Sequence, residues 1–317
     1  MPADADSTAG GSDDSSFDIL GIGMSMMDSI QVVDEFPSGA GITESPVATL
    51  MGGGPVPTAL CAASVLGVRA GIIDQIGGDW CSDLILKDYA RFGVDCRYLH
   101  RQDGRSSTYG SVMVRRSDGE RHIVFTRGTF DELSLSQLPV KDLEACPILH
   151  LNGRHWDCAC EAARIVKAGG GRVSFDGGAN RYESRFLPLL EEVDILIVAR
   201  DFAEKLSNST DREAQMAALG QWGAEIVGIT DGEKGSWFLP RGERVFHQPA
   251  FAVSPVVDTT GCGDVFHGAF LASLSRGSSW RDCAAFASAA AACNVLAPGG
   301  RGNLPTVEKV AERLNFS

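Results

Sequence analysis

One short segment of the chain combines a carboxylate with two closely spaced glycines. Residues Asp258–Asp264 (DTTGCGD) follow an extended apolar stretch and precede Val265–Ser275, whose spacing predicts a helix. Glycines at a turn into a helix let the backbone approach a ligand closely, and the free N–H groups of the first helical turn bind anions. Asp264 stands at this helix start. A carboxylate there either caps the helix or takes a proton from a hydroxyl group beside a bound phosphate.

Two other glycine-containing turns and several strand ends could also face a ligand. Met51–Thr58 (MGGGPVPT) leads into a predicted helix, and Thr230–Gly235 (TDGEKG) follows a predicted strand. Asn152 and Arg154 follow another predicted strand, and open α/β sheets bind ligands at the carboxyl ends of their strands. Each of these turns, taken alone, is an ordinary connection between elements.

The turns belong to a chain in which strand-like and helix-like segments alternate. This alternation predicts a mostly parallel sheet with helices on both faces. The helix over 211–222 follows a capping-box pattern that starts at Thr210. The predicted strands are 17–23, 69–76, 148–152, 172–176, 195–198 and 226–230, and the predicted helices are 58–66, 83–92, 158–168, 200–206, 211–222 and 265–275.

Two segments, about 28–50 and 105–130, interrupt this alternation. The first is irregular and β-like, and the second holds two strand-like runs joined around Asp118-Gly119, which predicts a hairpin. We expect a small sheet that stands off the main one and closes over the site as a lid. The alternative is that these strands extend the edge of the main sheet. Residues 1–16, rich in Asp, Ser and Gly, predict a disordered acidic tail, and residues 17–317 predict a single domain.

The overall composition excludes several classes of protein. The 317 residues are 44% hydrophobic and have a net charge of −13, which argues against binding to nucleic acid or to an anionic membrane surface. A phosphorylated ligand would need local positive charge. No run is long enough to span a bilayer. Because the first residues lack a basic region followed by an apolar one, we expect no signal peptide. Nine scattered cysteines predict buried, reduced thiols in a cytoplasmic protein. A Rossmann dehydrogenase would require a G-x-G-x-x-G motif after the first strand, and this sequence has none there.

Taken together, the turns resemble the signatures of the PfkB/ribokinase-like carbohydrate kinases. Asp258–Asp264 is similar to the family's D-T-x-G-A-G-D, with Cys262 in place of the usual Ala. Met51–Thr58 resembles the first signature, with Thr58 where Asn is common, and Thr230–Gly235 resembles the T-x-G-x-x-G loop at the nucleotide phosphates. The resemblance covers nearly the whole chain after residue 17. It implies a ribokinase-like three-layer α/β/α sandwich with a small β-sheet lid. Within the family, the resemblance points to a ketohexokinase-like or a sulfofructose-kinase-like branch.

The resemblance also implies an activity and a set of site residues. It implies that Asp264 is the general base for ATP-dependent phosphorylation of a sugar hydroxyl, on a ketose or a furanose, with the backbone of Gly261, Cys262 and Gly263 as the anion hole and Mg²⁺ on the phosphates. The helix over 289–296 and the glycines after it would frame the adenine. The implied residues are Thr230, Gly232, Gly235, Thr259, Gly261, Gly263 and Asn294 for the nucleotide; Asp28, Gly53, Gly54, Thr58, Thr108, Arg127 and Asn152 for the sugar; and Asp258, Thr260, Ala297, Gly299 and Asn303 for a monovalent cation such as K⁺.

The chain departs from the family pattern in ways that affect these expectations. Cys262 would place a thiol, which could be reactive, beside the phosphates. The family's N-x-x-E motif is absent at 198–202, so Asp201 or Glu204 would have to supply its carboxylate. Residues 176–181 only loosely match a D-x-N-x-R stretch, in which Arg181 would face a phosphate.

The sequence leaves other functions open. Arginines such as Arg127 and Arg154 would favour an acidic or phosphorylated sugar, whereas apolar residues around the site would favour a nucleoside. The near alternatives are therefore a kinase for a keto-deoxy sugar acid or for a nucleoside, and the distant one is a non-catalytic protein that senses a sugar or nucleotide. Lids in this family often mediate dimers, so a homodimer through the lid is expected from the resemblance.

Overall fold

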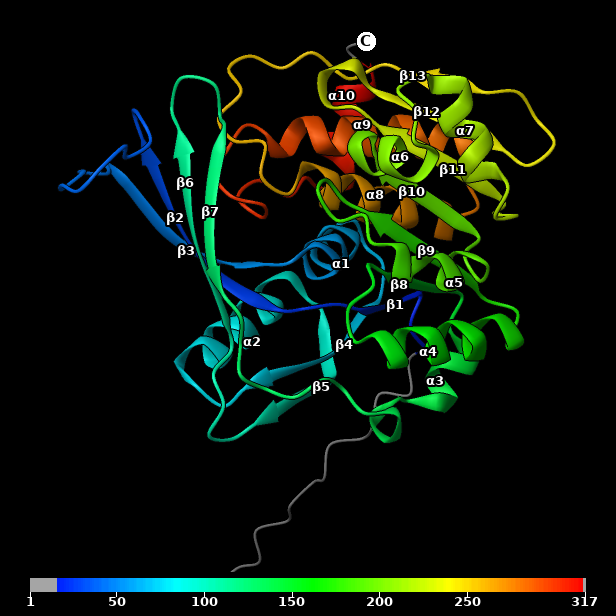
Figure 1. The fold of residues 1–317 in the computed structure, drawn as a ribbon, viewed down its shortest axis with the longest axis horizontal. Helices are drawn as coiled ribbons and strands as arrows, with labels where there is room; N and C mark the ends of the chain where they lie inside the picture. Colours follow the sequence, from blue (N-terminus) through cyan, green and yellow to red (C-terminus); the bar gives the residue numbers. More distant parts are fainter. Residues whose placement is uncertain (1–15, 316–317) are drawn as a thin grey trace, which may run out of the picture.

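A nine-stranded, mostly parallel sheet runs through the molecule (Figure 1). The computed structural model describes residues 16–315, so the predicted acidic tail lies outside the described residues except for Ser16. All neighbouring strands are parallel except for the β11–β12 and β12–β13 pairs. In spatial order the strands are β13 (Phe246–Gln248), β12 (Ser236–Pro240), β11 (Ile226–Thr230), β10 (Ile195–Ala199), β9 (Arg172–Gly177), β8 (Ile148–Leu151), β1 (Ile19–Ile22), β4 (Ala70–Gly77) and β5 (Asp95–Gln102).

Helices cover both faces of this sheet because successive buried side chains of its strands point to opposite sides. Ile19 packs into one apolar cluster and Leu20 into the other. The predicted three-layer arrangement is therefore confirmed. One face carries α1 (Pro55–Val65), α2 (Trp80–Phe92), α8 (Cys262–Ser275), α9 (Trp280–Asn294) and α10 (Val307–Asn315), and the other carries α3 (Val140–Ala145), α4 (Trp156–Ala168), α5 (Leu187–Leu190), α6 (Arg200–Ser207) and α7 (Arg212–Gly220).

A second sheet of four strands stands off the main one, at the left of Figure 1. Its order is β3 (Val47–Gly53), β2 (Met26–Val33), β6 (Thr108–Arg115) and β7 (Arg121–Thr126). The outer pairs are antiparallel and the central β2–β6 pair is parallel. The prediction of a separate small sheet is confirmed, and the alternative of extra edge strands is wrong.

Some local predictions need correction. The helix over 211–222 is capped by Asp211, whose side chain accepts a hydrogen bond of 2.9 Å from the N–H of Ala214, and not by Thr210. The strands β5, β12 and β13 were not predicted. Among residues 16–315, no helix combines the length and the apolar character that crossing a membrane requires.

The order of the strands places a ligand-binding edge next to β1. The chain builds β4 and β5 on one side of β1 and then β8 to β13 on the other, and ligands of open α/β sheets bind where the strand order reverses in this way. A buried network spans this point. The Asp74 carboxylate, within β4, accepts hydrogen bonds from the N–H of Ser25, after β1, and from Nε2 of His155, after β8, at 2.5 and 2.6 Å.

Candidate active site

The turn before α8 is held rigidly by a neighbouring loop. Gly261 caps the helix with a φ of +72°, and a side chain there would overlap the backbone of Gly300. The buried Asp258 carboxylate accepts hydrogen bonds from the N–H of Thr260 and from the N–H of Gly299, each at 2.7 Å. The first N–H groups of α8 are thus fixed in place before a ligand arrives, which is what an anion site requires.

Asp264 does not cap the helix that it begins. It is the third residue of α8, the cap is Gly261, and among the described residues its carboxylate accepts no hydrogen bond. Burial raises the pKa of Asp264 to about 6, and the neighbouring Asp176 raises it further, whereas Arg181, His267 and Arg121 act in the opposite direction. A carboxylate with this pKa is ionised at neutral pH and is a stronger proton acceptor than an ordinary aspartate.

A cavity of about 770 Å³ lies beside the turn and brings together two motifs that are far apart in the sequence. Its lining includes Thr230, Gly232 and Gly235 from one motif and Thr259, Cys262 and Gly263 from the other. The apolar part of its lining includes Phe251, Val256, Phe266, Ala291, Ala292 and Val295. A mainly apolar pocket with a few polar groups is suited to a ligand with an aromatic ring and a charged tail.

Asn294 and the loop after α9 lie elsewhere than the resemblance implied. Asn294 is buried behind the turn, where its side-chain nitrogen donates to the carbonyl of Thr260 at 3.3 Å, and it does not line the cavity. Gly299 packs against Ile30 and Met51 of the small sheet. The end of α9 therefore borders the apolar part of the cavity, whereas the glycines after it border the phosphate turn and the small sheet.

The thiol of Cys262 is not activated, contrary to expectation. Burial raises its pKa to about 12, and the charges of Asp258 and Asp264 act in the same direction. A thiol with this pKa is protonated at neutral pH, and the thiolate is the reactive form. This raised pKa argues against the hypothesis of a reactive thiol beside the phosphates.

We expect Cys262→Ala to keep kcat/KM within about twofold of the original value, because the turn presents its backbone and not this side chain. Steady-state kinetics would measure this, and treatment with iodoacetamide at pH 7.5 should leave activity intact. Inactivation that ATP prevents and that Cys262→Ala abolishes would contradict the assignment.

On the other side of the turn, Asp28 in β2 presents a carboxylate with an unused oxygen. Glycines make room for it, since a side chain at Gly53 or at Gly110 would overlap its oxygens. Its Oδ1 is buried and has no hydrogen-bond partner among the described residues. Burial raises the pKa of Asp28 to about 6, an effect that Arg301 opposes and Asp264 reinforces. Asp28 thus lies near Asp264 and could accept a hydrogen bond from a hydroxyl group of a ligand.

A buried arginine that was not predicted holds the neighbouring turn. Arg301 donates from Nε to the hydroxyl of Thr58 at 3.2 Å and from Nη2 to the carbonyl of Gly53 at 2.9 Å, and it forms an ion pair with Asp88. Thr58 is therefore engaged by Arg301 from within the protein. Gly54, with a φ of +92°, caps α1 at this point. The only hint in the sequence is an arginine placed between glycines, at 299–302.

The other residues that the resemblance assigned to the sugar have different surroundings. The buried Thr108 accepts a hydrogen bond of 3.0 Å from the N–H of Gly128, so it closes the end of the small sheet. Asn152, at the end of β8, is buried and its Oδ1 has no partner among the described residues. Arg127 follows β7 and is exposed.

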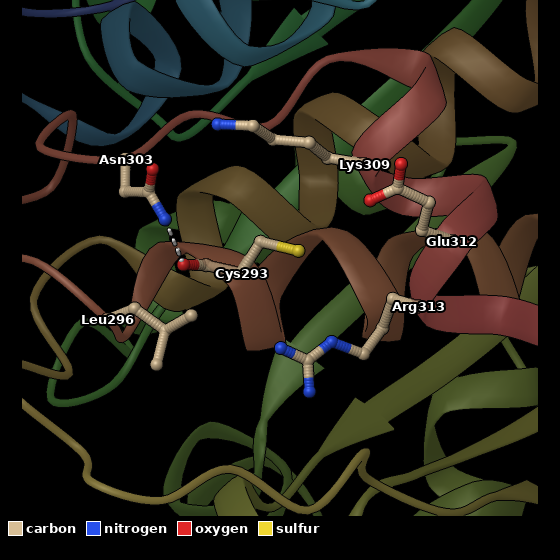
Figure 2. Close-up of a pocket in the computed structure, with 6 residues that line it drawn as sticks. All are labelled: Cys293, Leu296, Asn303, Lys309, Glu312 and Arg313. Atoms are coloured by element: carbon tan, nitrogen blue, oxygen red, sulfur yellow. Dashed lines mark hydrogen bonds between the residues drawn. The ribbon is translucent and has the colours of Figure 1, made fainter. Parts of the chain in front are cut away.

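Among the implied ligands of a monovalent cation, Asp258, Thr260 and Gly299 lie together, whereas the side chain of Asn303 contacts the end of α9. Asp258, Thr260 and Gly299 are joined by the hydrogen bonds described above. Both Asp258 oxygens are used in them. Figure 2 shows Asn303 in a different pocket, of about 440 Å³, with its amide nitrogen donating to the carbonyl of Cys293 at 2.7 Å. Asn303 therefore points its donor, and not its oxygen, at its neighbour. Ala297 follows α9 in the loop that leads to Gly299.

The carboxylates that could replace the missing N-x-x-E motif are already engaged. Asp201 accepts a hydrogen bond of 2.6 Å from the N–H of Asn180, and Glu204 pairs with Arg200 at 3.6 Å. Asp176, the first residue of the loose D-x-N-x-R match, pairs with His267 at 3.2 Å. Burial would raise the pKa of Asp176, but the charges of His267 and Arg181 hold it below its usual value.

The tip of the small sheet reaches the phosphate turn. Arg121, at the start of β7, donates from Nη1 to the hydroxyl of Thr259 at 3.0 Å, and that hydroxyl lies 3.4 Å from the carbonyl of Gly119. Asp118, in the same hairpin, lines the 770 Å³ cavity. The sequence predicted the hairpin but not this contact. Arg121 brings a positive charge from the small sheet to the turn.

Comparisons with known proteins agree with this geometry. Residues 17–307 match a family model described as pfkB family carbohydrate kinase. A protein of Archaeoglobus fulgidus named as an uncharacterized sugar kinase is 28% identical over 249 residues, which cover 76% of this chain and 97% of that protein. It is the match of almost all the described residues to one family model that decides the family.

Solved structures share the fold. The ribokinase of Arabidopsis thaliana complexed with ribose and ATP has 23% identity and a TM-score of 0.80, over 96% of this chain and 100% of that one. An E. coli protein in complex with ATP and Mg²⁺ has 24% identity and a TM-score of 0.81, over 95% and 100%. The fold is therefore the ribokinase-like α/β fold, and with the family match the chain belongs to the pfkB family of carbohydrate kinases.

Proposed function

We propose that the protein transfers the terminal phosphoryl group of ATP to a hydroxyl group of a sugar, with Asp264 as the general base. The observation that supports this most directly is the position of Asp264. It directly follows Cys262 and Gly263, which line the cavity, and its charge acts on Asp28. It accepts no hydrogen bond among the described residues, and burial raises its pKa to about 6. A helix-capping aspartate would be bonded to the backbone.

The proposed mechanism assigns each group a task. The unpaired oxygens of Asp28 and Asn152 would accept hydrogen bonds from the sugar. Asp264 would take the proton of the attacking hydroxyl while the new oxygen–phosphorus bond forms and ADP leaves. The N–H groups at 261–264, with Arg121 and Arg181, would stabilise the charge on the transferred group. Contact between the lid hairpin and the turn would exclude water, which otherwise competes as the nucleophile.

The cavity supports a purine nucleotide as the phosphate donor. Its apolar lining residues would enclose the ring, and Thr230, Gly232 and Gly235 would lie along the ribose and phosphates. The E. coli structure holds ATP with Mg²⁺, and the same pair is proposed here. Among the described residues no group of three acidic, histidine or cysteine side chains could hold a metal ion. Mg²⁺ would therefore arrive on the phosphates of the nucleotide.

The small sheet would also join two copies of the chain in the proposed homodimer. Its edge strand β7 leaves Ile123, Val124 and Phe125 about half exposed, and Val47 and Leu50 on the opposite edge strand are also exposed. Apolar side chains on an unpaired sheet edge favour association with another chain.

A substrate panel tests the proposed function. ADP release would be followed by a coupled assay with ketoses, furanoses, nucleosides and sugar acids, and ³¹P NMR would identify the phosphorylated hydroxyl. We expect ADP release that depends on one class of sugar. Binding of ATP without turnover on any member of the panel would favour a sensing protein, and turnover restricted to nucleosides would favour a nucleoside kinase.

A further inference from the structure

Three arginines near the proposed site have no acidic partner. None of Arg127, Arg154 and Arg181 has a carboxylate within ion-pair distance among residues 16–315. Acidic residues outnumber basic ones by 41 to 28 in this chain, so partners are not scarce. Unpaired guanidinium groups gathered in one region of such a protein point to an anion that is supplied from outside.

The three arginines come from both sheets. Arg154 follows the end of β8 and Arg181 follows the end of β9, and these strands are parallel neighbours, so their ends share one edge. On the small sheet, Asp28 pairs in register with Gly110 and Gly110 with Phe125. Arg127, two residues beyond Phe125, continues the face that carries Asp28.

The segment that carries Arg154 is fixed in an unusual conformation. Gly153 has a φ of +80°, and a side chain there would overlap the ring of Phe186. His155 has a φ of +49° and is bonded on both sides, by Nε2 to Asp74 at 2.6 Å and by Nδ1 to Glu132 at 2.8 Å. Backbone held in this region is strained and occurs mainly at functional sites. The nearest carboxylate, Glu132, is thus committed to His155.

The free protein leaves complementary groups without partners here. Arg154 is partly buried, which lowers its pKa, and the charges of Arg127 and Arg181 lower it further. Nearby polar oxygens on Asp28 and Asn152 are buried and unpaired. A neutral sugar would satisfy these oxygens with its hydroxyl groups but would leave the partly buried guanidinium of Arg154 uncompensated, which is costly for a charge partly removed from water.

We propose that the sugar phosphorylated by this protein carries an oxyanion of its own, remote from the reacting hydroxyl, and that Arg154 and Arg127 bind it. The oxyanion would be a carboxylate, a sulfonate or a phosphate ester. Arg181 is close enough to Asp264 and Asp176 to lower the pKa of both, so its charge would serve the transferred phosphoryl group. This inference rests on the proposed function, because it names the class of sugar for that same site.

Binding can be separated from turnover with the Asp264→Asn protein. Isothermal titration calorimetry would compare fructose with fructose 6-phosphate, with 6-deoxy-6-sulfofructose and with 2-keto-3-deoxygluconate. We expect at least one anionic sugar to bind about tenfold or more tighter than fructose. In the same background, Arg154→Gln or Arg127→Gln should weaken that binding by about tenfold to a hundredfold and change fructose binding much less, whereas Arg154→Lys should keep part of it.

A matched control and a salt series keep the test decisive. Arg164→Gln removes an exposed arginine of α4 that pairs with Glu161 at 3.3 Å. It should change neither the affinity for the anionic sugar nor the affinity for fructose. If Arg154→Gln does not fold, as shown by circular dichroism, the salt series decides, because binding of the anionic sugar should weaken as ionic strength rises.

Two results would overturn the inference: equal affinities for neutral and anionic sugars, or a loss of ATP affinity instead of sugar affinity in Arg154→Gln. Failure of the proposed function is distinct, since the anionic sugar would then bind while the unmodified protein released no ADP.

Discussion

Asp264→Asn should lower kcat for sugar phosphorylation by about a thousandfold and leave the affinity for ATP nearly unchanged. The amide has the size of the carboxylate but cannot accept a proton from the attacking hydroxyl. The nucleotide should be held mainly by the backbone of the turn and by the cavity wall, neither of which this change alters. Rapid-quench measurements of the chemical step, with calorimetry for ATP, would check both parts.

The pH dependence gives the same prediction an independent readout. Because Asp264 must be unprotonated to act and its pKa is about 6, kcat should fall about tenfold for each pH unit below 6 and level off above about 7. Asp28 also has a pKa of about 6 and is therefore the matched control. Asp28→Asn should raise KM for the sugar and keep the acid limb of kcat, whereas Asp264→Asn should abolish that limb. Turnover by Asp264→Asn within about tenfold of the original rate would place the base elsewhere.

The parts of the site that could be predicted from sequence are those built by consecutive residues. The turn before α8 needs glycines at fixed offsets before a helix, so the sequence of Asp258–Asp264 is enough to predict its geometry. The two sheets were predictable for a similar reason, since the alternation of apolar segments and the hairpin signal at Asp118-Gly119 are local patterns. Even here the helix start needed the structure, because only hydrogen-bond geometry separates a capping Asp264 from an uncapped one.

The parts that could not be predicted depend on residues far apart in the chain. Arg301 contacts Thr58 across 243 positions and pairs with Asp88, which in the sequence resembles an ordinary residue of an amphipathic helix. The contact between Arg121 and Thr259 likewise depends on how far the lid reaches toward the turn. A single sequence contains no signal for such pairings. The resemblance assigned Thr58 and Thr259 to the site, but it did not assign their partners, Arg301 and Arg121.

Arg301→Met should produce the largest loss of stability among the changes considered. Arg301 is 3% exposed, and removing one partner of a buried ion pair costs about 3–5 kcal/mol because the other charge stays buried and unpaired. Urea unfolding would measure the change in the free energy of unfolding. The control is Arg101→Met, which breaks an exposed ion pair of 2.9 Å with Asp83. Asp83 lies in α2, the helix that also contains Asp88, and the change should cost less than about 1 kcal/mol.

A double variant separates the role of Arg301 in stability from its role at the site. Arg301→Met with Asp88→Leu removes both charges, and replacing a buried pair with apolar side chains is often neutral for stability. Stability should therefore recover. KM for the sugar should stay high, because the Gly53 carbonyl and the Thr58 hydroxyl would still lack the donors that hold them next to Asp28. If KM recovers together with stability, Arg301 only stabilises the fold. If Arg301→Met costs less than about 1 kcal/mol, the ion pair with Asp88 does not hold this turn in place.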